Sequence, residues 1–492
     1  MKNVMVESRF DVRGGLNAQT SPNLLNTNEV YLAENVRLSS VDGAAERRGG
    51  STRLTPSPLG GPVTGLRQWD APGGKQVVAV AGGSFHYRTG FSGSFTSITP
   101  SPAMGSSPAQ METARQNAEN APLRLYVADG LRVRRWTGSG SLVNLSGSSG
   151  IPSNVDVMAN YGVRMFWHST GYPQSLYWGV LGDPEDGTAG LGDQGGAGLV
   201  DVRRGEGIVA LHPVGSSLLI ATPNSIARFS GYSAGDIQIA QDTQGISNEI
   251  GAVGPKALVG TEDIATIAAE RDVYALSESE LRPIGRKVKR IYQGIDRGAL
   301  GEVALGYHPV KRELYVAYRE VGASTQKTVL AYSTELDTWY GPFRYPFGIE
   351  CFALYENAQG DKEMMVGCSD GHVRILDRGE ADDMGSGQEK AIGGLLQPAD
   401  LFFEAGPHTL KTFRRLSVQH EMAEDTYVEV GLQADEGPWQ KRPVQGEGSL
   451  KDRRLDFYAQ GKRFRVRFRF FGKGKARIHG FTAQAFNMVR EV

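Results

Sequence analysis

The sequence predicts an all-β fold in three parts: an extended N-terminal arm, a ring of small antiparallel sheets, and a C-terminal antiparallel β-sandwich. Glycine is abundant, with 64 among 492 residues, and aromatic residues make up 9%. This composition favours many short strands joined by tight turns over long helices. Strand–turn–strand units recur through the middle of the chain, and the pattern changes near residues 60 and 395. We therefore expect the arm at residues 1–60, the ring at 61–395 and the sandwich at 396–492.

The middle region contains a degenerate repeat of apolar strands around polar or glycine turns. The turns fall near Gly83, Gly130, Gly171, Asn224, Ser279, Gly322 and Gly371. Asp129-Gly130 and Asp370-Gly371 suit the positive backbone angles of a two-residue hairpin. A period of about 40–50 residues with several strands per unit is typical of β-propeller blades. We expect a propeller of six to eight blades; the alternative is a tandem of β-sandwiches, with strands every 8–12 residues and no coarser period.

The arm is polar and strand-poor up to about Leu59. Its most unusual stretch, GGLNAQTSPNLLNTNEVYLAENV, runs over residues 14–36. Gly14-Gly15 and Pro22 disfavour a helix at its start. Five apolar residues are too sparse for a core but sufficient for docking on a surface, and they are the candidate inter-subunit residues: Leu16, Leu24, Leu25, Val30 and Leu32. We expect the arm to pack along its own propeller or along that of a neighbouring subunit.

The C-terminal region reads as five strands, after a charged and glycine-rich linker at residues 377–394. The clearest alternation in the protein is KRFRVRFRFF, which begins at Lys462. Its apolar face points inward, and four arginines point outward: Arg463, Arg465, Arg467 and Arg469. This row is a candidate interface or channel surface that meets phosphate or an acidic partner. The alternative is a solvated face whose arginines pair with cross-strand acids such as Glu429 or Asp456.

Motifs that would indicate catalysis or metal binding are weak. The net charge of −1 gives the whole molecule no attraction for nucleic acid or membrane. The G-x-G-x-x-G in GLGDQGGAG lacks the preceding strand and following helix of a dinucleotide site. There is no P-loop and no Cys/His cluster with zinc spacing, and Cys351 and Cys368 read as two buried thiols. We expect no cofactor, no metal, no membrane insertion and no enzymatic activity. The best helix candidate is short, at residues 107–122.

The two ends and the middle of the chain resemble proteins of tailed bacteriophages. At the N-terminus, a "GGLN…P…L" segment followed by "AxN" and "RRxG" is similar to the start of their tail and neck proteins. The matching residues are Gly14, Gly15, Leu16, Asn17, Pro22, Leu25, Ala33, Asn35, Arg47, Arg48 and Gly49. The segments that begin at Lys411 and Lys462 resemble their closing sandwich strands, and the segment from Tyr172 resembles a mid-propeller segment. The nearest family is the propeller tail hub, or nozzle, of short-tailed phages.

The resemblance implies a structural virion protein, a homohexameric ring below the portal and adaptor that lines or gates the DNA ejection channel. Its implied partners are the head–tail adaptor, tail fibre, spike or needle proteins, and, transiently, phage DNA. The implied location is the virion tail, after synthesis in the bacterial cytoplasm. Two alternatives stay open: a propeller enzyme that acts on a glycan, and an interaction propeller of non-viral origin.

Overall fold

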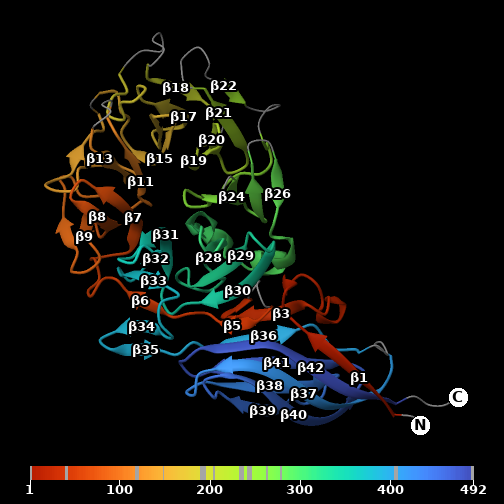
Figure 1. The fold of residues 1–492 in the computed structure, drawn as a ribbon. Helices are drawn as coiled ribbons and strands as arrows, with labels where there is room; N and C mark the ends of the chain where they lie inside the picture. Colours follow the sequence, from red (N-terminus) through yellow and green to blue (C-terminus); the bar gives the residue numbers. More distant parts are fainter. Residues whose placement is uncertain are drawn as a thin grey trace.

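Nearly all the regular secondary structure of the described residues is β-strand, arranged as a propeller beside a sandwich (Figure 1). The structure is a computed structural model that describes residues 3–38, 43–116, 121–147, 149–188, 196–202, 206–231, 238–240, 246–261, 264–277, 280–403 and 408–488. Within them the helices are single turns or little more: η1 (Pro22–Leu24), η2 (Arg286–Val288), α1 (Lys289–Tyr292) and η3 (Arg297–Glu302). The predicted fold class, an all-β propeller with a C-terminal β-sandwich, is confirmed.

Six blades are four-stranded antiparallel meanders in which each strand pairs with the next along the chain. The first three are β7 (Val63–Ala71), β8 (Gly74–Ala81), β9 (Ser84–Thr89) and β10 (Thr96–Ile98); β11 (Gln110–Ala114), β12 (Arg124–Ala128), β13 (Val133–Trp136) and β14 (Val143–Asn144); and β15 (Val155–Tyr161), β16 (Arg164–Ser169), β17 (Tyr172–Trp178) and β18 (Gly198–Asp201). The next three are β19 (Ala210–Val214), β20 (Ser217–Ala221), β21 (Ile226–Ser230) and β22 (Gln238–Ala240); β23 (Leu258–Thr261), β24 (Ile264–Ala268), β25 (Val273–Leu276) and β26 (Leu281–Pro283); and β27 (Ala304–His308), β28 (Glu313–Tyr318), β29 (Thr328–Ser333) and β30 (Thr338–Arg344).

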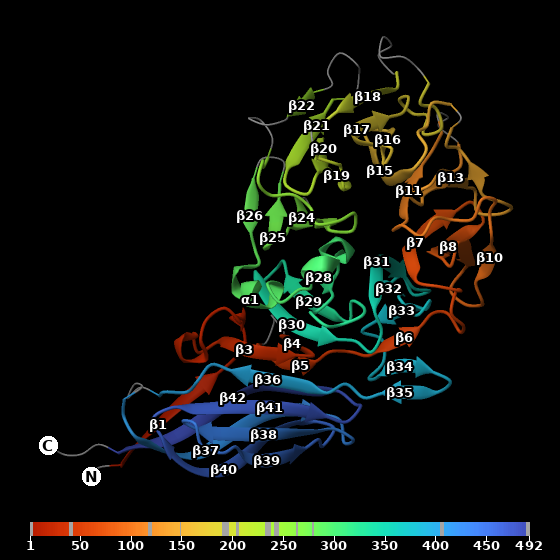
Figure 2. The ribbon, with the colours of Figure 1, turned by 180° about the vertical axis from the view of Figure 1, so that it is seen from behind.

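The seventh blade joins the two ends of the propeller. It consists of β31 (Ile349–Glu356), β32 (Lys362–Cys368), β33 (Val373–Leu376) and, as its outer strand, β6 (Ser51–Arg53) from the N-terminal segment. β6 runs antiparallel to β33, with Thr52 opposite Ile375. The innermost strands contact one another in chain order, and β31 contacts β7, so the ring is closed (Figures 1 and 2).

The hairpin turns predicted from the repeat occupy equivalent places in the blades. Those at Gly83, Gly130, Gly171, Asn224, Gly322 and Gly371 each lie between the second and third strand of a blade. Several of these glycines have a positive φ, for example 75° at Gly83 and 81° at Gly130, as tight turns require. The turn near Ser279 lies outside the described residues.

The expectation of a strand-poor N-terminal segment is wrong. It contains β1 (Asn3–Phe10), β2 (Gly15–Leu16), β3 (Glu29–Glu34), β4 (Val36–Leu38), β5 (Ala45–Arg47) and β6. β1 pairs with β42 (Ala476–Met488), and β3 pairs with β36 (Gly394–Pro398). These strands are stabilised by partners hundreds of residues away, so local sequence carries little sign of them.

The sandwich has two sheets that enclose an apolar core. One has the order β4-β5-β42-β37-β40, with β1 also on β42; the other continues from β30 through β3, β36, β41, β38 and β39. The strands not yet bounded are β37 (Lys411–Met422), β38 (Tyr427–Ala434), β39 (Gln440–Gln445), β40 (Leu450–Gly461) and β41 (Phe464–Phe471). The five strands expected from the sequence correspond to β37, β38, β40, β41 and β42. Phe413, Phe464 and Phe468 are fully buried between the sheets.

Two local expectations fail because tertiary pairing overrides local sequence. The helix expected at residues 107–122 contains β11, the inner strand of the second blade, and residues 117–120 lie outside the described part. The linker expected at 377–394 contains a hairpin of β34 (Asp382–Gly385) and β35 (Gln388–Lys390). β34 also meets β6 at Asp382 and Ser51, which attaches the linker to the seventh blade.

Candidate functional site

The apolar residues of the N-terminal arm divide into buried and exposed members. Leu16 and Val30 are fully buried within this chain, Leu25 and Leu32 are half-buried, and Leu24 is 74% exposed. The arm therefore packs along its own chain. A contact with a neighbouring subunit stays a prediction for all five residues, and Leu24 is the member with a free apolar surface to offer.

Three residues of the N-terminal motif, Asn35, Arg47 and Arg48, form a joint between propeller and sandwich. Asn35 has φ 53° and accepts hydrogen bonds at Oδ1 from Arg48 Nε (3.1 Å) and the Arg344 amide (2.7 Å). The Arg48 guanidinium forms an ion pair with Asp382 (2.7 Å) and lies 4.1 Å from the centre of the Tyr345 ring. Both partners of this ion pair are buried, with side chains 1% and 3% exposed.

The neighbouring residues of the motif attach the joint to the other elements. Arg47 donates to the carbonyl of Ile392 (3.2 Å) and to the carbonyls of the β41–β42 turn at residues 472–474. A Cβ on Gly50 would lie 2.0 Å from the carbonyl oxygen of Ala381, so the backbones touch where β6 begins. The Arg-Arg-Gly-Gly sequence thus joins the arm, the last blade and the sandwich at one place.

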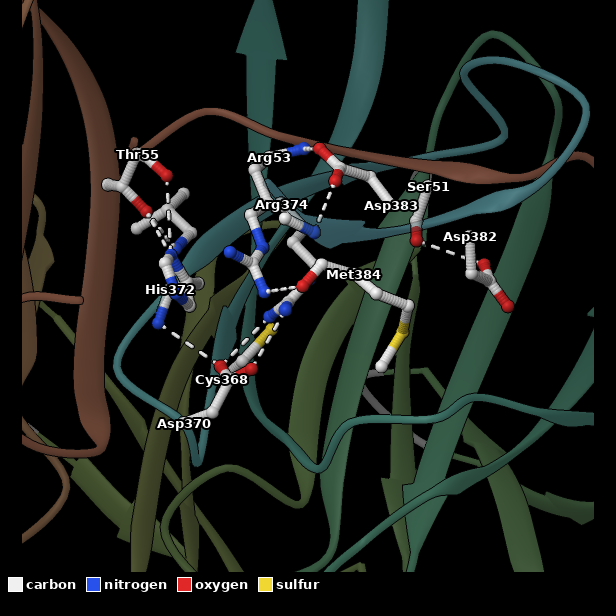
Figure 3. Close-up of polar contacts among 12 residues, drawn as sticks. Ser51, Arg53, Thr55, Cys368, Asp370, His372, Arg374, Asp382, Asp383 and Met384 are labelled. Carbon is white, nitrogen blue, oxygen red and sulfur yellow. Dashed lines mark hydrogen bonds and ion pairs between the residues drawn. The ribbon is translucent and has the colours of Figure 1, made fainter. Parts of the chain in front are cut away.

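Side-chain contacts on both sides of β6 attach this strand to the seventh blade, where the ring closes (Figure 3). The Thr55 hydroxyl lies 3.1 Å from His372 Nδ1, and the Arg53 amide donates to Asp383 (3.2 Å). Next to them, Arg374 forms a bidentate pair with Asp370, each contact 2.8 Å long. These contacts are structural. Sequence reasoning missed the Thr55–His372 and Arg53–Asp383 contacts because they join residues 317 and 330 positions apart.

The two cysteines of the seventh blade, Cys351 on β31 and Cys368 on β32, are free and buried. Burial raises the pKa of Cys368, which lies beside Arg374 (Figure 3), to about 12, and raises that of Cys351 to about 11. Both thiols are therefore protonated and unreactive at neutral pH.

One half of the arginine row on β41 is neutralised by acidic side chains. Arg465 Nε lies 3.3 Å from Asp400, and Arg463 Nε lies 3.5 Å from the same carboxylate. Arg463 also forms an ion pair with Glu436. Burial raises the pKa of Asp400, even though both guanidiniums act to lower it. Arg463 and Arg465 therefore serve to hold a buried carboxylate.

The other half of the row, Arg467 and Arg469, has an excess of positive charge. Arg467 donates to Gln397 Oε1 (3.3 Å) and lies 4.2 Å from the centre of the Trp439 ring, and it has no carboxylate partner among the described residues. Arg469 is 4.0 Å from Glu429, which pairs more closely with Lys441 at 3.2 Å. The cross-strand pairing considered from the sequence is thus present at Glu429. Asp456 instead pairs with Arg415 on the other sheet. The role of the row as an interface or channel stays a prediction.

Two cavities lie along the propeller axis, on either side of residues 255–256. One, of about 450 Å³, is lined by residues of the inner strands β7, β11, β23, β27 and β31. The other, of about 660 Å³, opens at the face that carries the β8–β9 turn and η3. Gln110 Nε2, in the second blade, donates to the Pro255 carbonyl (3.1 Å), just before the fifth blade, and Lys256 Nζ donates to the Glu350 carbonyl. These bonds cross the axial space between non-adjacent blades and block it.

The second cavity contains an acid pair that sequence reasoning did not find. Glu302 and Glu350 both line it, together with Lys256 and Arg319. Burial raises the pKa of Glu350, Lys256 opposes this, and Glu302 adds to it. Glu302 forms an ion pair with Arg319 at 3.2 Å. The two acids come from different blades, so only the folded ring brings them together.

The described ranges of the chain contain no group of three or more His, Cys, Asp and Glu side chains arranged to hold a metal ion. No helix in those ranges is long and apolar enough to cross a membrane. The G-x-G-x-x-G at Gly190, Gly192 and Gly195 lies outside the described residues.

Comparison with known proteins gives distant structural similarities. No family model matches the chain, and no curated protein matches it. Among solved structures, BBS1N, in its complex with ARL6DN, is 12% identical with a TM-score of 0.43, over 67% of this chain and 96% of that one. The N-terminal domain of Nup159 is 8% identical with a TM-score of 0.41, over 70% and 98%. The extracellular domain of the two-component system BT4673 from B. thetaiotaomicron is 9% identical with a TM-score of 0.43, over 81% and 47%. At these values the similarities assign no function.

Proposed function

We propose that this protein is a structural component of a bacteriophage tail, a hub or nozzle that forms a ring below the portal and adaptor. In that ring it lines or gates the channel through which DNA leaves. The adaptor would contact it on one side, and fibre, spike or needle proteins on the other. Its place would be the virion tail, and it would act without catalysis, cofactor or membrane insertion.

One observation carries the proposal. The residues that resemble the phage motif are spread over the first 50 positions, yet Asn35, Arg47 and Arg48 meet at a single joint. Part of the resemblance therefore falls on one joint that holds the arm, the propeller and the sandwich together. The same three-part architecture is what the phage resemblance implies.

The hydrogen bonds across the propeller axis support a DNA channel that lies outside the single propeller. Because Gln110 and Lys256 form bonds across the axial space, DNA cannot pass through a single propeller. The channel in this proposal is enclosed by several copies arranged around a common axis. A cyclic ring needs two different complementary patches on each copy.

The exposed side chain of Leu24 offers a test of this ring. We expect Leu24→Ser to leave the thermal midpoint unchanged and to weaken ring assembly, since it removes apolar surface from the arm. Val310→Ser is the matched control, because Val310 is 70% exposed on a propeller turn. Assembly would be measured by sedimentation velocity. If both variants assemble equally well, the arm is not part of the interface between subunits. If the wild-type protein is a monomer at all concentrations, the proposed function is overturned.

The acid pair at the second cavity supports one other function, hydrolysis of a glycan. The two carboxyl groups at one cavity fit the pair that a glycosidase needs, and burial, which raises the pKa of Glu350, suits that residue to the role of general acid. Release of reducing sugar from bacterial capsule or cell-wall polysaccharide tests it. Glu350→Gln should abolish that release, whereas the exposed control Glu335→Gln should not. Absence of release by the wild-type protein would eliminate this second function.

A further inference from the structure

We infer that Arg467 and Arg469, the open half of the arginine row, form together with Trp439 a binding surface for the phosphate backbone of double-stranded DNA. This inference takes its partner from the proposed function and goes beyond it by naming the residues that touch DNA. It separates these residues from Arg463 and Arg465, which hold the buried Asp400.

The outer face of the sheet is built to present these side chains. Glu429 and Gly431 on β38 lie opposite Arg469 and Arg467 on β41. A Cβ on Gly431 would lie 2.9 Å from the Trp439 ring. The absence of a side chain at Gly431 therefore lets the indole lie against the sheet, 4.2 Å from the Arg467 guanidinium. This contact orients the Arg467 side chain, and the residue as a whole is half-buried.

The charge balance of this surface calls for an external anion. Arg469 and Lys441 share the carboxylate of Glu429, and Arg467 beside them has no carboxylate partner among the described residues. Burial lowers the pKa of Arg467, and the positive charges of Arg469 and Arg465 lower it further. The mutual repulsion that this reflects would be relieved by a polyanion laid across the row.

The spacing of the row favours DNA over an acidic protein. Alternate residues on a strand are about 6.7 Å apart, and one DNA strand presents a phosphate about every 3.4 Å along its axis. Two guanidiniums on one strand can therefore meet one backbone without matched partner side chains. The guanidinium fork also suits the bidentate geometry of phosphate. Beyond Arg469, the exposed and stacked Tyr427 and Phe471, 4.8 Å between ring centres, extend the surface.

Fluorescence polarisation of a labelled 20-bp duplex, titrated with the full-length protein across a range of KCl concentrations, tests the inference. Each phosphate contact contributes about 0.9 to the slope of log affinity against log salt. Arg467→Gln with Arg469→Gln should thus reduce the slope by about 1.8. The affinity at 50 mM salt should fall at least about tenfold. The matched control is Arg453→Gln with Arg454→Gln, which removes the same charge from exposed positions on β40 and should bind like the wild type.

A footprint on the wild-type protein avoids dependence on the variants. Phenylglyoxal modification followed by peptide mass analysis should show that DNA protects Arg467 and Arg469 and leaves Arg453 and Arg454 unprotected. Equal loss of affinity in both double variants, or no protection of Arg467 and Arg469, would overturn the inference. So would a variant that loses self-association but keeps its DNA affinity, because the face would then join copies of this chain. Failure of the wild type to form a ring would instead overturn the proposed function, since DNA titration needs no particular oligomer.

Discussion

Removing the buried guanidinium of Arg48 tests whether the joint holds the three parts of the chain together. Arg48→Met keeps the aliphatic stem of the side chain and deletes the guanidinium, with its charge and its side-chain hydrogen bonds. Asp382 is then left with a side chain 3% exposed and without its cation, although the Ser51 hydroxyl still donates to it (2.9 Å). The variant also loses the hydrogen bond to Asn35 and the contact with the Tyr345 ring.

The expected cost of this change follows from burial. Breaking a buried ion pair by removing one partner costs about 3–5 kcal/mol, because the remaining charge is uncompensated. Asp382→Asn should cost less than this, since the isosteric amide keeps some hydrogen bonds. The double variant should be more stable than the sum of the two single changes implies, by about 2 kcal/mol. The exposed pair Arg415–Asp456, 2.9 Å apart with side chains 41% and 76% exposed, provides the control. Arg415→Met should cost under about 1 kcal/mol.

The assay is equilibrium urea unfolding, followed by tryptophan fluorescence and by proteolysis between the last blade and the sandwich. Arg48→Met should lower the urea concentration at the unfolding midpoint. It should also expose residues 377–394 to protease well before the blades unfold. If Arg48→Met and Arg415→Met cost the same, or if the double variant is simply additive, Arg48 does not form the joint described here.

Two further changes probe the packing and the pH dependence of the propeller. Gly50→Ala should destabilise the chain by about 1–3 kcal/mol, because the new methyl group would lie 2.0 Å from the Ala381 carbonyl oxygen. Gly73→Ala, where nothing lies within 4 Å of the added atom, should leave the thermal midpoint unchanged, and equal midpoints for the two variants would refute this. Burial lowers the pKa of His212 to about 4, against about 6.5 in the unfolded chain, so its contribution to stability is complete above pH 6.5 and is lost as the pH falls towards 4. Unfolding of His212→Gln across this range should show a shallower pH dependence than the wild type, and parallel curves would contradict the cause given.

The sequence was informative wherever neighbouring residues settle the structure. Glycine and Asp-Gly turns repeat with the spacing of blades, and each blade is a meander of adjacent strands. The alternation of Phe464 to Phe470 with arginines predicted β41 because one face of that strand is buried. The split of the arginine row could not be predicted, because it depends on Asp400 and Trp439, which reach the row from outside β41.

Elements that depend on distant partners were not predictable. β6 pairs with β33 and β1 with β42, across more than 300 residues, and their short sequences have little propensity of their own. The same holds for Arg48 with Asp382 and for Glu302 with Glu350. In each case the closed ring brings the two residues together, and a single sequence holds no sign of the distance between them.

In the proposed function, copies of this chain assemble into a closed ring. Native mass spectrometry of the purified protein, with negative-stain class averages viewed down the symmetry axis, tests this assembly most directly. We expect a single species near six times the 53.2 kDa of one chain, with an open centre between propellers. A mass of one chain at micromolar concentration, unchanged when the adaptor protein is added, would contradict it.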